Sequence, residues 1–414
     1  MQLVPRAVPV VGAKGSHIFL ADGRAILDGI SSWWVTLLGH CHPAISRAIA
    51  EQASTLDQVI FAGFTHEPAS SLARDLVELA PTGLEKVFLS DNGSTAVEVA
   101  LKLALQYWYH QGEHRTIFLA LEDAYHGDTF GSMSVSSESV FTKPFQEHLF
   151  RVRRLPFPTP ADSGDSMSEA ESKFLDALGH ACRTEPIAGF IYEPLLLGAG
   201  GMRSWRPEIL SKALSIAKSH GVLCIADEVL TGFGRTGRMF ASEYVSERPD
   251  LMTLSKGITG GFLPLGATLC TRTLFDAFLS KDRGRAFFHG HSYTGNPISC
   301  AAACATLQVM RQEPVFDAIE EIARIHTLLG PALAERHGMR MRHIGTVAAF
   351  SPETSAGYLS DRALLISAET LQRSLLIRPL GDVVYLLPPY STTTADLERA
   401  YAVLDDVLLQ ISKS

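Results

Sequence analysis

One lysine of the sequence has surroundings that suggest covalent chemistry. Lys256 lies in the stretch LMTLSKGITGG, where it follows an apolar run typical of a buried strand and precedes a glycine-rich loop. A buried ammonium group is costly unless its pKa falls, and a desolvated neutral amine is the nucleophile that forms a Schiff base with a carbonyl compound. Taken alone, Lys256 is equally well explained as a strand-end lysine whose amine reaches solvent.

An acidic pair ends the preceding apolar run. The stretch GVLCIADEVLTGFGRTG indicates a buried strand that ends in Asp227 and Glu228. Carboxylates at the carboxyl end of a parallel strand point into the ligand crevice. An aspartate in that place can keep a pyridine nitrogen protonated, so that the ring accepts electrons from a carbanion. A pair of solvated turn residues is the simpler alternative.

A third stretch has the pattern of a phosphate site. FLSDNGSTAVEVALKLALQYW contains a strand, then Gly93, Ser94 and Thr95, then an amphipathic helix. Glycine lets the backbone approach an anion, and the N–H groups and dipole of a helix N-terminus attract it. A capped helix without a ligand is the alternative, because Glu98 resembles the last residue of a capping box. Together with Asp227 and Lys256, however, the pattern favours a phosphate-bearing cofactor held by the lysine.

A glycine motif follows the acidic pair and suggests a different class of enzyme. Gly232, Gly234 and Gly237 match the dinucleotide fingerprint G-x-G-x-x-G, which would indicate an oxidoreductase. The match is weak, because it comes after the acidic residues instead of about 20 residues before them, and no clear helix starts at Gly237.

These motifs need a sheet that brings the ends of several strands together. Between residue 86 and residue 271, short apolar runs alternate with helical-period segments at 94–109 and 208–220, which predicts an α/β fold with a mostly parallel sheet. The predicted strands are 86–90, 116–121, 187–193, 222–227, 251–255 and 267–271. The Pro- and Ser-rich segment 156–172 is predicted to be a surface excursion.

The pattern changes after about residue 305. Long helices at 313–337 and 393–412 and short strands at 346–350 and 383–387 predict a smaller α+β unit. The first forty residues, with a hairpin around Asp22-Gly23, are too short to fold alone and are expected to pack on this unit. We therefore predict a large domain at 45–305 and a small domain formed by 1–44 and 306–414.

Bulk composition limits the possible partners. The net charge of −8 comes from interspersed acidic and basic residues, without a basic block for nucleic acid. The sequence contains neither a signal-peptide pattern nor an apolar window of about 18 to 20 residues that would cross a membrane. The six cysteines fall singly, without metal-ligand spacing, which predicts buried reduced thiols and a cytoplasmic protein without a structural metal.

The motifs, taken in order, resemble those of the class III aminotransferases of PLP fold type I. The resemblance spans nearly the whole chain and rests on Gly93-Ser94, Tyr125-His126-Gly127, Asp227-Glu228, Lys256 and HGHSYTGNP. It implies helices on both faces of the large sheet, a small domain built from both termini, and pyridoxal 5'-phosphate (PLP) as cofactor. It also implies that Lys256 forms the Schiff base and moves the proton, Asp227 pairs with the pyridine nitrogen, Tyr125 stacks on the ring, and Gly93 and Ser94 bind the phosphate.

The same resemblance implies a homodimer. Family members form dimers in which the loop written here as Gly290-His291-Ser292 reaches the phosphate of the other subunit. His291 and Ser292 are therefore expected to bind the cofactor, and Gly290 the substrate, across shared active sites.

Within the family, the pair Trp33-Trp34 and the stretches YHGDTFGSMSV and LLIRPLGDVVYLLPPY are similar to the branch that converts 8-amino-7-oxononanoate to 7,8-diaminononanoate in biotin synthesis. Two indoles supply flat apolar walls, and the Arg378 guanidinium can bind a carboxylate with two hydrogen bonds. The implied substrate-binding residues are Trp33, Trp34, Tyr125, Lys256, Gly290 and Arg378. A core role for each Trp and a surface role for Arg378 are the alternatives.

Two departures from this branch concern the amino donor. Members that use S-adenosylmethionine begin with a segment that carries an aromatic His-Pro-Tyr motif, and this chain starts after that position. They also typically have HGPTFMGNP, where this chain has HGHSYTGNP, with His291 for Pro and Ser292 for Thr. S-adenosylmethionine is the expected donor and lysine the alternative, while an ω-amino-acid or ornithine-type transferase is the alternative activity.

Overall fold

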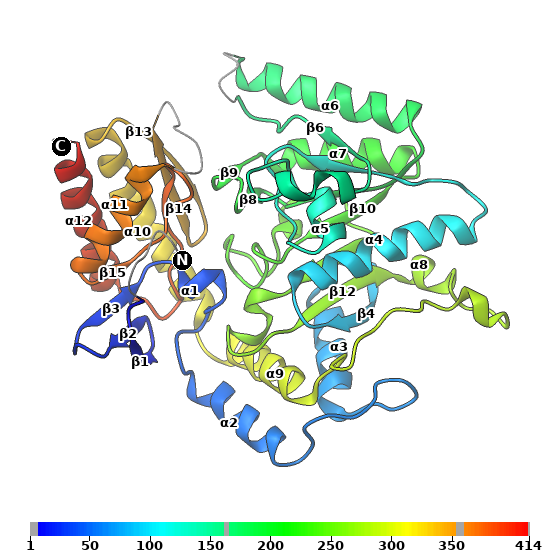
Figure 1. Cartoon of the computed structure of the whole chain (residues 1–414), viewed down its shortest axis with the longest axis horizontal. Helices are drawn as coiled ribbons and strands as arrows, with labels where there is room; N and C mark the ends of the chain where they lie inside the picture. Colours follow the sequence, from blue (N-terminus) through cyan, green and yellow to red (C-terminus); the bar gives the residue numbers. More distant parts are fainter. Residues whose placement is uncertain (1–6, 161–164, 353–359, 413–414) are drawn as a thin grey trace.

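A seven-stranded sheet lies at the centre of the larger part of the molecule (Figure 1). The computed structural model describes residues 7–160, 165–352 and 360–412. The sheet has the order β4-β12-β11-β10-β7-β5-β6. Its strands are β4 (Leu84–Ser90), β5 (Ile117–Leu121), β6 (Val152–Leu155), β7 (Ile187–Tyr192), β10 (Leu223–Asp227), β11 (Leu251–Leu254) and β12 (Gly266–Thr271).

All six predicted strands of this sheet are confirmed within two residues at each end. Strands β11, β10, β7, β5 and β6 are parallel, and β12 is antiparallel to both of its neighbours. Strand β6 was not predicted, because its residues VRRL include two arginines at the sheet edge and so lack the apolar run of the central strands.

Helices cover both faces of this sheet, as expected. Alternate residues of β5 belong to different hydrophobic clusters: Phe118 and Ala120 pack with residues of α4, whereas Leu119 and Leu121 pack with residues of α6 and α7. The helices of this part are α2 (Pro43–Ala53), α3 (Glu67–Leu79), α4 (Gly93–His110), α5 (Phe130–Val135), α6 (Met167–Thr184), α7 (Pro207–Ser219), α8 (Arg272–Asp276) and α9 (Pro297–Gln312). The two predicted helices correspond to α4 and α7.

The predicted surface excursion 156–172 is partly wrong. Residues 161–164 lie outside the described part of the chain, but Met167 already begins helix α6. Ser166 and Glu169 form a capping box in which each side chain accepts a hydrogen bond from the backbone N–H of the other. The Pro-, Ser- and Asp-rich composition that suggested a loop therefore ends in a helix-start signal at Ser166.

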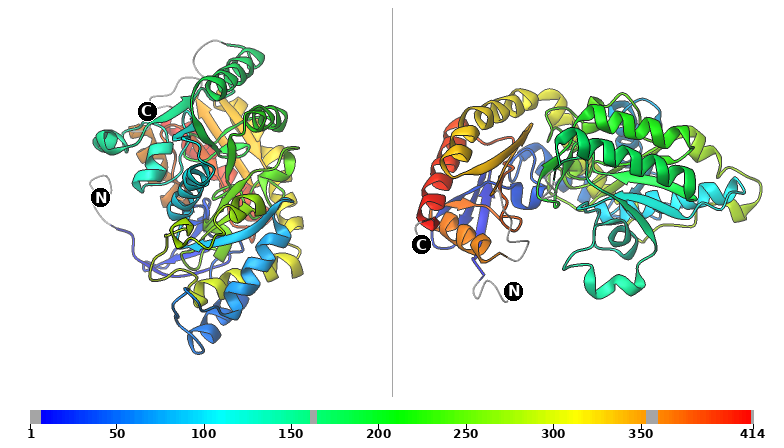
Figure 2. Two further views of the ribbon diagram at one scale, coloured as in Figure 1. Left: turned by 90° about the vertical axis from the view of Figure 1, so that its right-hand side faces the viewer. Right: turned by 90° about the horizontal axis from the view of Figure 1, so that it is seen from above.

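A second unit lies beside the large sheet and joins both ends of the chain (Figures 1 and 2). One of its sheets has the order β1-β2-β3-β15, in which the C-terminal strand β15 runs parallel to β3. The hairpin predicted around Asp22-Gly23 is confirmed by the antiparallel pairing of β2 with β3. The strands of this unit are β1 (Val10–Lys14), β2 (His17–Leu20), β3 (Ala25–Asp28), β13 (Met339–Ile344), β14 (Val347–Pro352), β15 (Leu375–Leu376) and β16 (Val384–Leu386).

Three helices, α10 (Val315–Arg336), α11 (Asp361–Gln372) and α12 (Thr394–Ile411), complete this unit. Helices α10 and α12 and strands β14 and β16 correspond to the predicted elements. Strand β13 and helix α11 were not predicted, since the residues MRMRHI of β13 carry three basic side chains and only two residues of α11 are buried. The domain bounds at residues 44 and 305 stay a prediction.

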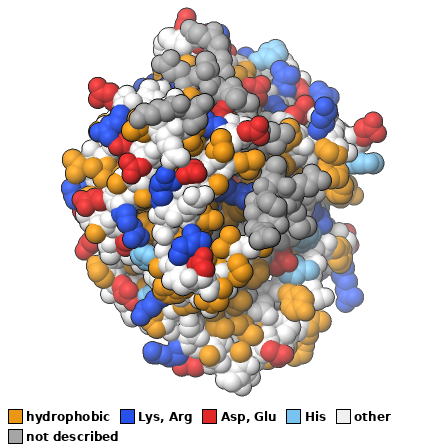
Figure 3. Space-filling view, turned by 60° about the vertical axis from the view of Figure 1, so that its left-hand side comes forward, with side chains coloured by type: hydrophobic (Ala, Val, Ile, Leu, Met, Phe, Trp, Pro, Cys, Tyr) orange, Lys and Arg blue, Asp and Glu red, His pale blue; other side chains and the backbone are white. Residues whose placement is uncertain are grey.

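The surface and the cysteines add two observations. Basic and acidic side chains are interspersed on the face shown in Figure 3, and in the described part of the chain no helix has the length and apolarity to cross a bilayer. All six cysteines are free thiols. Cys224, Cys270 and Cys300 are buried, as expected. Cys41 is exposed, so the expectation of buried thiols is wrong for this residue.

Candidate active site

A cavity of about 630 Å³ opens at the carboxyl ends of the parallel strands. Residues that follow β5, β7, β10 and β11 line it, together with the start of helix α4 and with Trp34, which lies six residues after β3. This is the edge at which ligands bind to open α/β sheets. The sequence-predicted residues that line the cavity are Trp34, Gly93, Ser94, Tyr125, Asp227 and Lys256.

Lys256 follows β11 after one residue and has a left-handed backbone, with φ of 45°. Such a conformation costs roughly 1–3 kcal/mol for a residue other than glycine and persists at functional sites. Desolvation lowers the pKa of the Lys256 amine, against the opposing charges of Asp227 and Glu193. The Nζ atom lies 4.7 Å from the centre of the Trp34 ring. The environment thus favours the neutral, nucleophilic amine.

Asp227, the last residue of β10, is held in a fixed orientation. Its Oδ2 atom lies 2.7 Å from His126 Nδ1, and its Oδ1 accepts hydrogen bonds from Val229 N at 3.1 Å and Thr253 Oγ1 at 3.3 Å. His126 lines the cavity too, and its buried Nε2 has no hydrogen-bond partner among the described residues. In the sequence, His126 belongs to the motif Tyr125-His126-Gly127, and no role was predicted for it.

Glu228, the other member of the acidic pair, is buried and does not line the cavity. Its carboxylate accepts hydrogen bonds from Thr231 Oγ1, from the backbone N–H groups of Ala241 and Ser242, and from Ser242 Oγ, at 2.5 to 3.1 Å. Burial raises the pKa of Glu228. Its role is therefore to anchor the turn that follows β10.

The start of helix α4 has the geometry of an anion site. The Asn92 side chain accepts a hydrogen bond from Thr95 N at 2.9 Å, whereas Gly93 and Ser94, earlier in the same turn, line the cavity. The first N–H groups of a helix have no intrahelical partner. A Cβ atom on Gly93 would lie 2.9 Å from the Val229 side chain, so only glycine allows this approach to the strand ends.

Glu193 is a cavity residue that sequence reasoning missed. It directly follows β7, and its carboxylate accepts hydrogen bonds from Tyr125 N at 3.1 Å and Gly198 N at 2.8 Å. Burial raises its pKa to about 7, with the nearby Asp227 charge acting in the same direction and His126 against it. The signal was a carboxylate directly after the apolar run IAGFIY, just as Asp227 directly follows the apolar residues of β10.

The remaining predicted residues do not line the cavity within one chain. The Arg378 guanidinium lies over the exposed Trp33 ring, 4.7 Å from its centre. Gly290 and Ser292 are exposed, and Ser292 O accepts a hydrogen bond from Gln58 Nε2 at 2.9 Å. The His291 backbone N–H bonds to Thr294 Oγ1 at 3.0 Å. The roles of these five residues stay predictions.

The glycine motif 232–237 is a packed turn and not a nucleotide loop. A Cβ atom on Gly234 would lie 2.6 Å from the Ile319 side chain of α10, so the turn is pressed against the second unit. Within it, the buried Arg235 donates a hydrogen bond to Pro388 O at 2.8 Å and lies over the Tyr390 ring. No helix begins at Gly237, which removes the support for a dinucleotide site.

The raised pKa of Glu193 predicts a pH-dependent stability. Above pH 4.5 the Glu193 carboxyl of the unfolded chain loses its proton, whereas the same carboxyl in the folded protein stays protonated up to about pH 7. The free energy of unfolding therefore falls as the pH rises from 4.5 to 7. At roughly 1.4 kcal/mol per pKa unit, the cofactor-free wild type should lose about 3 kcal/mol of unfolding free energy relative to Glu193→Gln over this interval. Urea unfolding of both proteins at intervals between pH 4.5 and 7 measures this difference, and parallel curves would contradict it.

Comparison with known proteins agrees with this arrangement. The chain is 46% identical over 411 residues to the adenosylmethionine-8-amino-7-oxononanoate aminotransferase of Synechococcus elongatus, covering 98% of this chain and 96% of that protein. The enzyme of that name from Helicobacter pylori is 34% identical, with coverage of 98% and 93%.

Solved structures of similar fold include two transaminases at 30% identity. The adenosylmethionine-8-amino-7-oxononanoate aminotransferase of Methanocaldococcus jannaschii superposes with a TM-score of 0.91, over 98% of this chain and 93% of that one. A PLP-bound amine transaminase from an uncultivated Pseudomonas species gives 0.93, over 98% and 95%. The family model of the class-III aminotransferases matches residues 3–408, and this chain therefore belongs to that family.

Proposed function

We propose that this enzyme transfers an amino group to 8-amino-7-oxononanoate and forms 7,8-diaminononanoate for biotin synthesis, with S-adenosylmethionine as the donor. The proposal rests on one observation above all: the Lys256 amine and the Asp227 carboxylate share a cavity with the Trp34 indole. The relatives that carry this activity in their names support the choice of substrates. In the net reaction the donor amine becomes a ketone and the acceptor ketone becomes an amine, so no external oxidant is needed.

The cofactor is pyridoxal 5'-phosphate, and the cavity residues fit it. When bound, it supplies a pyridinium ring that accepts the electron pair released as a C–H bond beside the amine breaks. Asp227, oriented by His126, holds the proton of the ring nitrogen. The N–H groups of Gly93 and Ser94, at the positive end of α4, bind the phosphate.

Lys256 and Tyr125 act on the reacting atoms. The Lys256 Nζ would hold the cofactor through its carbonyl carbon and, once released, would carry the proton to and from the substrate carbon. The Tyr125 ring would cover the face of the pyridine ring, and Glu193 fixes the Tyr125 backbone by accepting a hydrogen bond from its N–H group.

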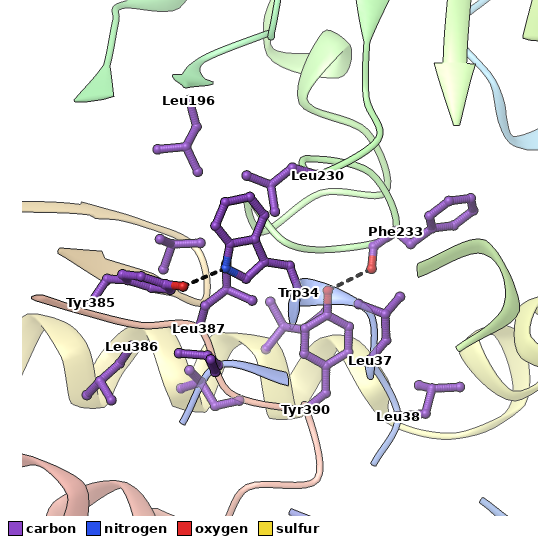
Figure 4. Packing of buried hydrophobic residues seen from close by; sticks show 14 of the residues in the cluster. Trp34, Leu37, Leu38, Leu196, Leu230, Phe233, Tyr385, Leu386, Leu387 and Tyr390 are labelled. Atoms are coloured by element: carbon purple, nitrogen blue, oxygen red, sulfur yellow. Dashed lines mark hydrogen bonds between the residues drawn. The ribbon is translucent and has the colours of Figure 1, made fainter. Parts of the chain in front are cut away.

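The acceptor has an apolar chain that ends in a carboxylate, and the second unit offers matching groups. Trp34 is 4% exposed, and its indole forms part of the cavity wall. Figure 4 shows this indole between Leu230 and Tyr385, whose hydroxyl accepts a hydrogen bond from Nε1 at 2.9 Å. Arg378, held over Trp33, binds the terminal carboxylate.

A cytoplasmic homodimer completes the proposal. Hydrogen bonds of Gln58 and Asn296 join the segments 57–66 and 288–296, which together expose large apolar side chains at 62% to 75%. Large exposed apolar side chains on joined segments are typical of subunit interfaces. The exposed residues are Ile60, Phe64, Phe288 and Tyr293. His291 and Ser292 lie between the last two in the sequence and, in a dimer, would face the phosphate of the other subunit. The six free thiols suit a reducing compartment.

Replacing the Schiff-base lysine should abolish turnover. We expect Lys256→Ala to lower kcat by at least about 10³-fold, because the nucleophile and the proton carrier are both lost. Turnover assays and far-UV circular dichroism measure activity and fold, with the exposed Lys281→Ala as the matched control. Residual turnover within about tenfold of wild type would contradict the role of Lys256.

A half-reaction assay tests the donor and the activity. We expect S-adenosylmethionine to convert the visible absorbance of the bound cofactor to that of pyridoxamine phosphate, and 8-amino-7-oxononanoate to restore it. Conversion by L-lysine and not by S-adenosylmethionine would change the donor. Restoration by ω-keto acids, with none by 8-amino-7-oxononanoate, would instead favour an ω-amino-acid transferase.

The interface can be tested by sedimentation. The variant Ile60→Ser with Tyr293→Ser should weaken the dimer and lower its apparent mass towards that of one chain, since it removes apolar area from the contact. Leu365→Ser, an exposed leucine in α11, is the control. A wild type that sediments as one chain at micromolar concentration would rule out the dimer.

A further inference from the structure

The two tryptophans lie on a short segment with an unusual backbone. In α1 (Ser31–Trp34), the residues Ser31, Ser32 and Trp34 have φ values of 52°, 61° and 67°. These are left-handed conformations in residues other than glycine, and each costs on the order of 1–3 kcal/mol. Such a run persists only where surrounding contacts impose it.

Asp28, the last residue of β3, supplies several of these contacts. It is 0% exposed. Its Oδ1 atom accepts a hydrogen bond from Ile30 N at 3.2 Å, and its Oδ2 accepts from Ser32 N at 2.7 Å and lies 3.4 Å from Ser32 Oγ. His40 Nε2 lies 2.8 Å from the same Oδ2. One buried carboxylate thus binds both sides of the bend.

His40 ties this carboxylate to the neighbouring strand. Its backbone exchanges two hydrogen bonds with Gly15, of 3.1 and 2.7 Å, so the imidazole is held at the end of the first hairpin. Neither Asp28 nor His40 lines the cavity. Any effect of the pair on the reaction must therefore pass through the segment that it holds.

The bend sends the two indoles in different directions. Trp34 enters the cavity wall, where Gly198 and Leu230 pack closely and Lys256 Nζ lies 4.7 Å away (Figure 4). Trp33 stays on the surface, 51% exposed, beneath the Arg378 guanidinium.

We propose that Asp28 and His40 form a positioning pair that sets the specificity of the enzyme for a long apolar substrate with a terminal carboxylate. The pair fixes the backbone bend at residues 31–34. This bend places the Trp34 indole in the cavity wall and the Trp33 ring beneath the Arg378 guanidinium. This inference rests on the proposed function, because it concerns the residues assigned there to the acceptor. Asp28 and His40 themselves touch no substrate.

A merely structural pair would lower stability and leave the kinetic constants of the folded enzyme unchanged. A positioning pair changes the KM of the long acceptor selectively. We expect Asp28→Asn to raise this KM by about tenfold, because an amide places a donor where a carboxylate accepts. The rate of the donor half-reaction should stay within about twofold of wild type. The control is Asp22→Asn, an exposed aspartate in the turn of the neighbouring hairpin.

A second pair of variants, at His40, tests the inference even if Asp28→Asn does not fold. His40→Ala removes one donor to Asp28 and should also raise the acceptor KM, while His40→Gln, whose amide can donate to the same oxygen, should restore it. Unchanged KM in His40→Ala, or no rescue by His40→Gln, would overturn the inference.

Two further measurements separate this inference from the proposed function. Arg378→Ala, assayed in parallel, should raise the acceptor KM. The affinity for nonanoate, measured by calorimetry, tests binding to the apolar wall in the absence of turnover. If the wild type does not use 8-amino-7-oxononanoate, the proposed substrate is wrong, and the effect of His40→Ala on nonanoate affinity still decides the inference. If Arg378→Ala raises KM and Asp28→Asn and His40→Ala do not, the positioning pair is refuted.

Discussion

The rest of the site depends on keeping one amine desolvated beside carboxylates. In water the amine of Lys256 would be an ammonium ion and no nucleophile. Burial at the end of β11 lowers its pKa, although Asp227 and Glu193 act against that change. The sheet places each acidic group at the end of a different strand, where hydrogen bonds from neighbouring donors hold it in place.

Much of this arrangement could be predicted because it follows from local sequence. An apolar run that ends in a polar residue predicts a strand end, and parallel strands bring such ends to one edge. Asp227, Lys256 and the start of α4 were found in this way. The edge strand β6 and the strand β13 were not, because charged residues interrupt their apolar patterns.

Other parts of the site depend on contacts between distant residues. The His126 to Asp227 contact joins positions 101 residues apart, and the Trp34 to Tyr385 bond joins positions 351 apart. No periodicity reveals such pairs. Glu193 lies at a strand end like Asp227, but it is a single carboxylate followed by Pro194 and three leucines, whereas Asp227 belongs to an acidic pair, so Glu193 did not suggest chemistry. The pairing of β3 with β15 likewise needs the tertiary fold.

The pairing of β3 with β15 also constrains the order in which the protein can be completed during synthesis. A ribosome releases the first hairpin early, yet the strand that joins its sheet ends only at Leu376. Ser31 Oγ then donates to Leu387 O, and the Trp34 indole to Tyr385, which are later still. Domains generally fold from the N-terminus during translation. Here the N-terminal wall of the catalytic cavity has to wait for the last tenth of the chain, so a nascent or prematurely terminated chain lacks a complete cavity wall.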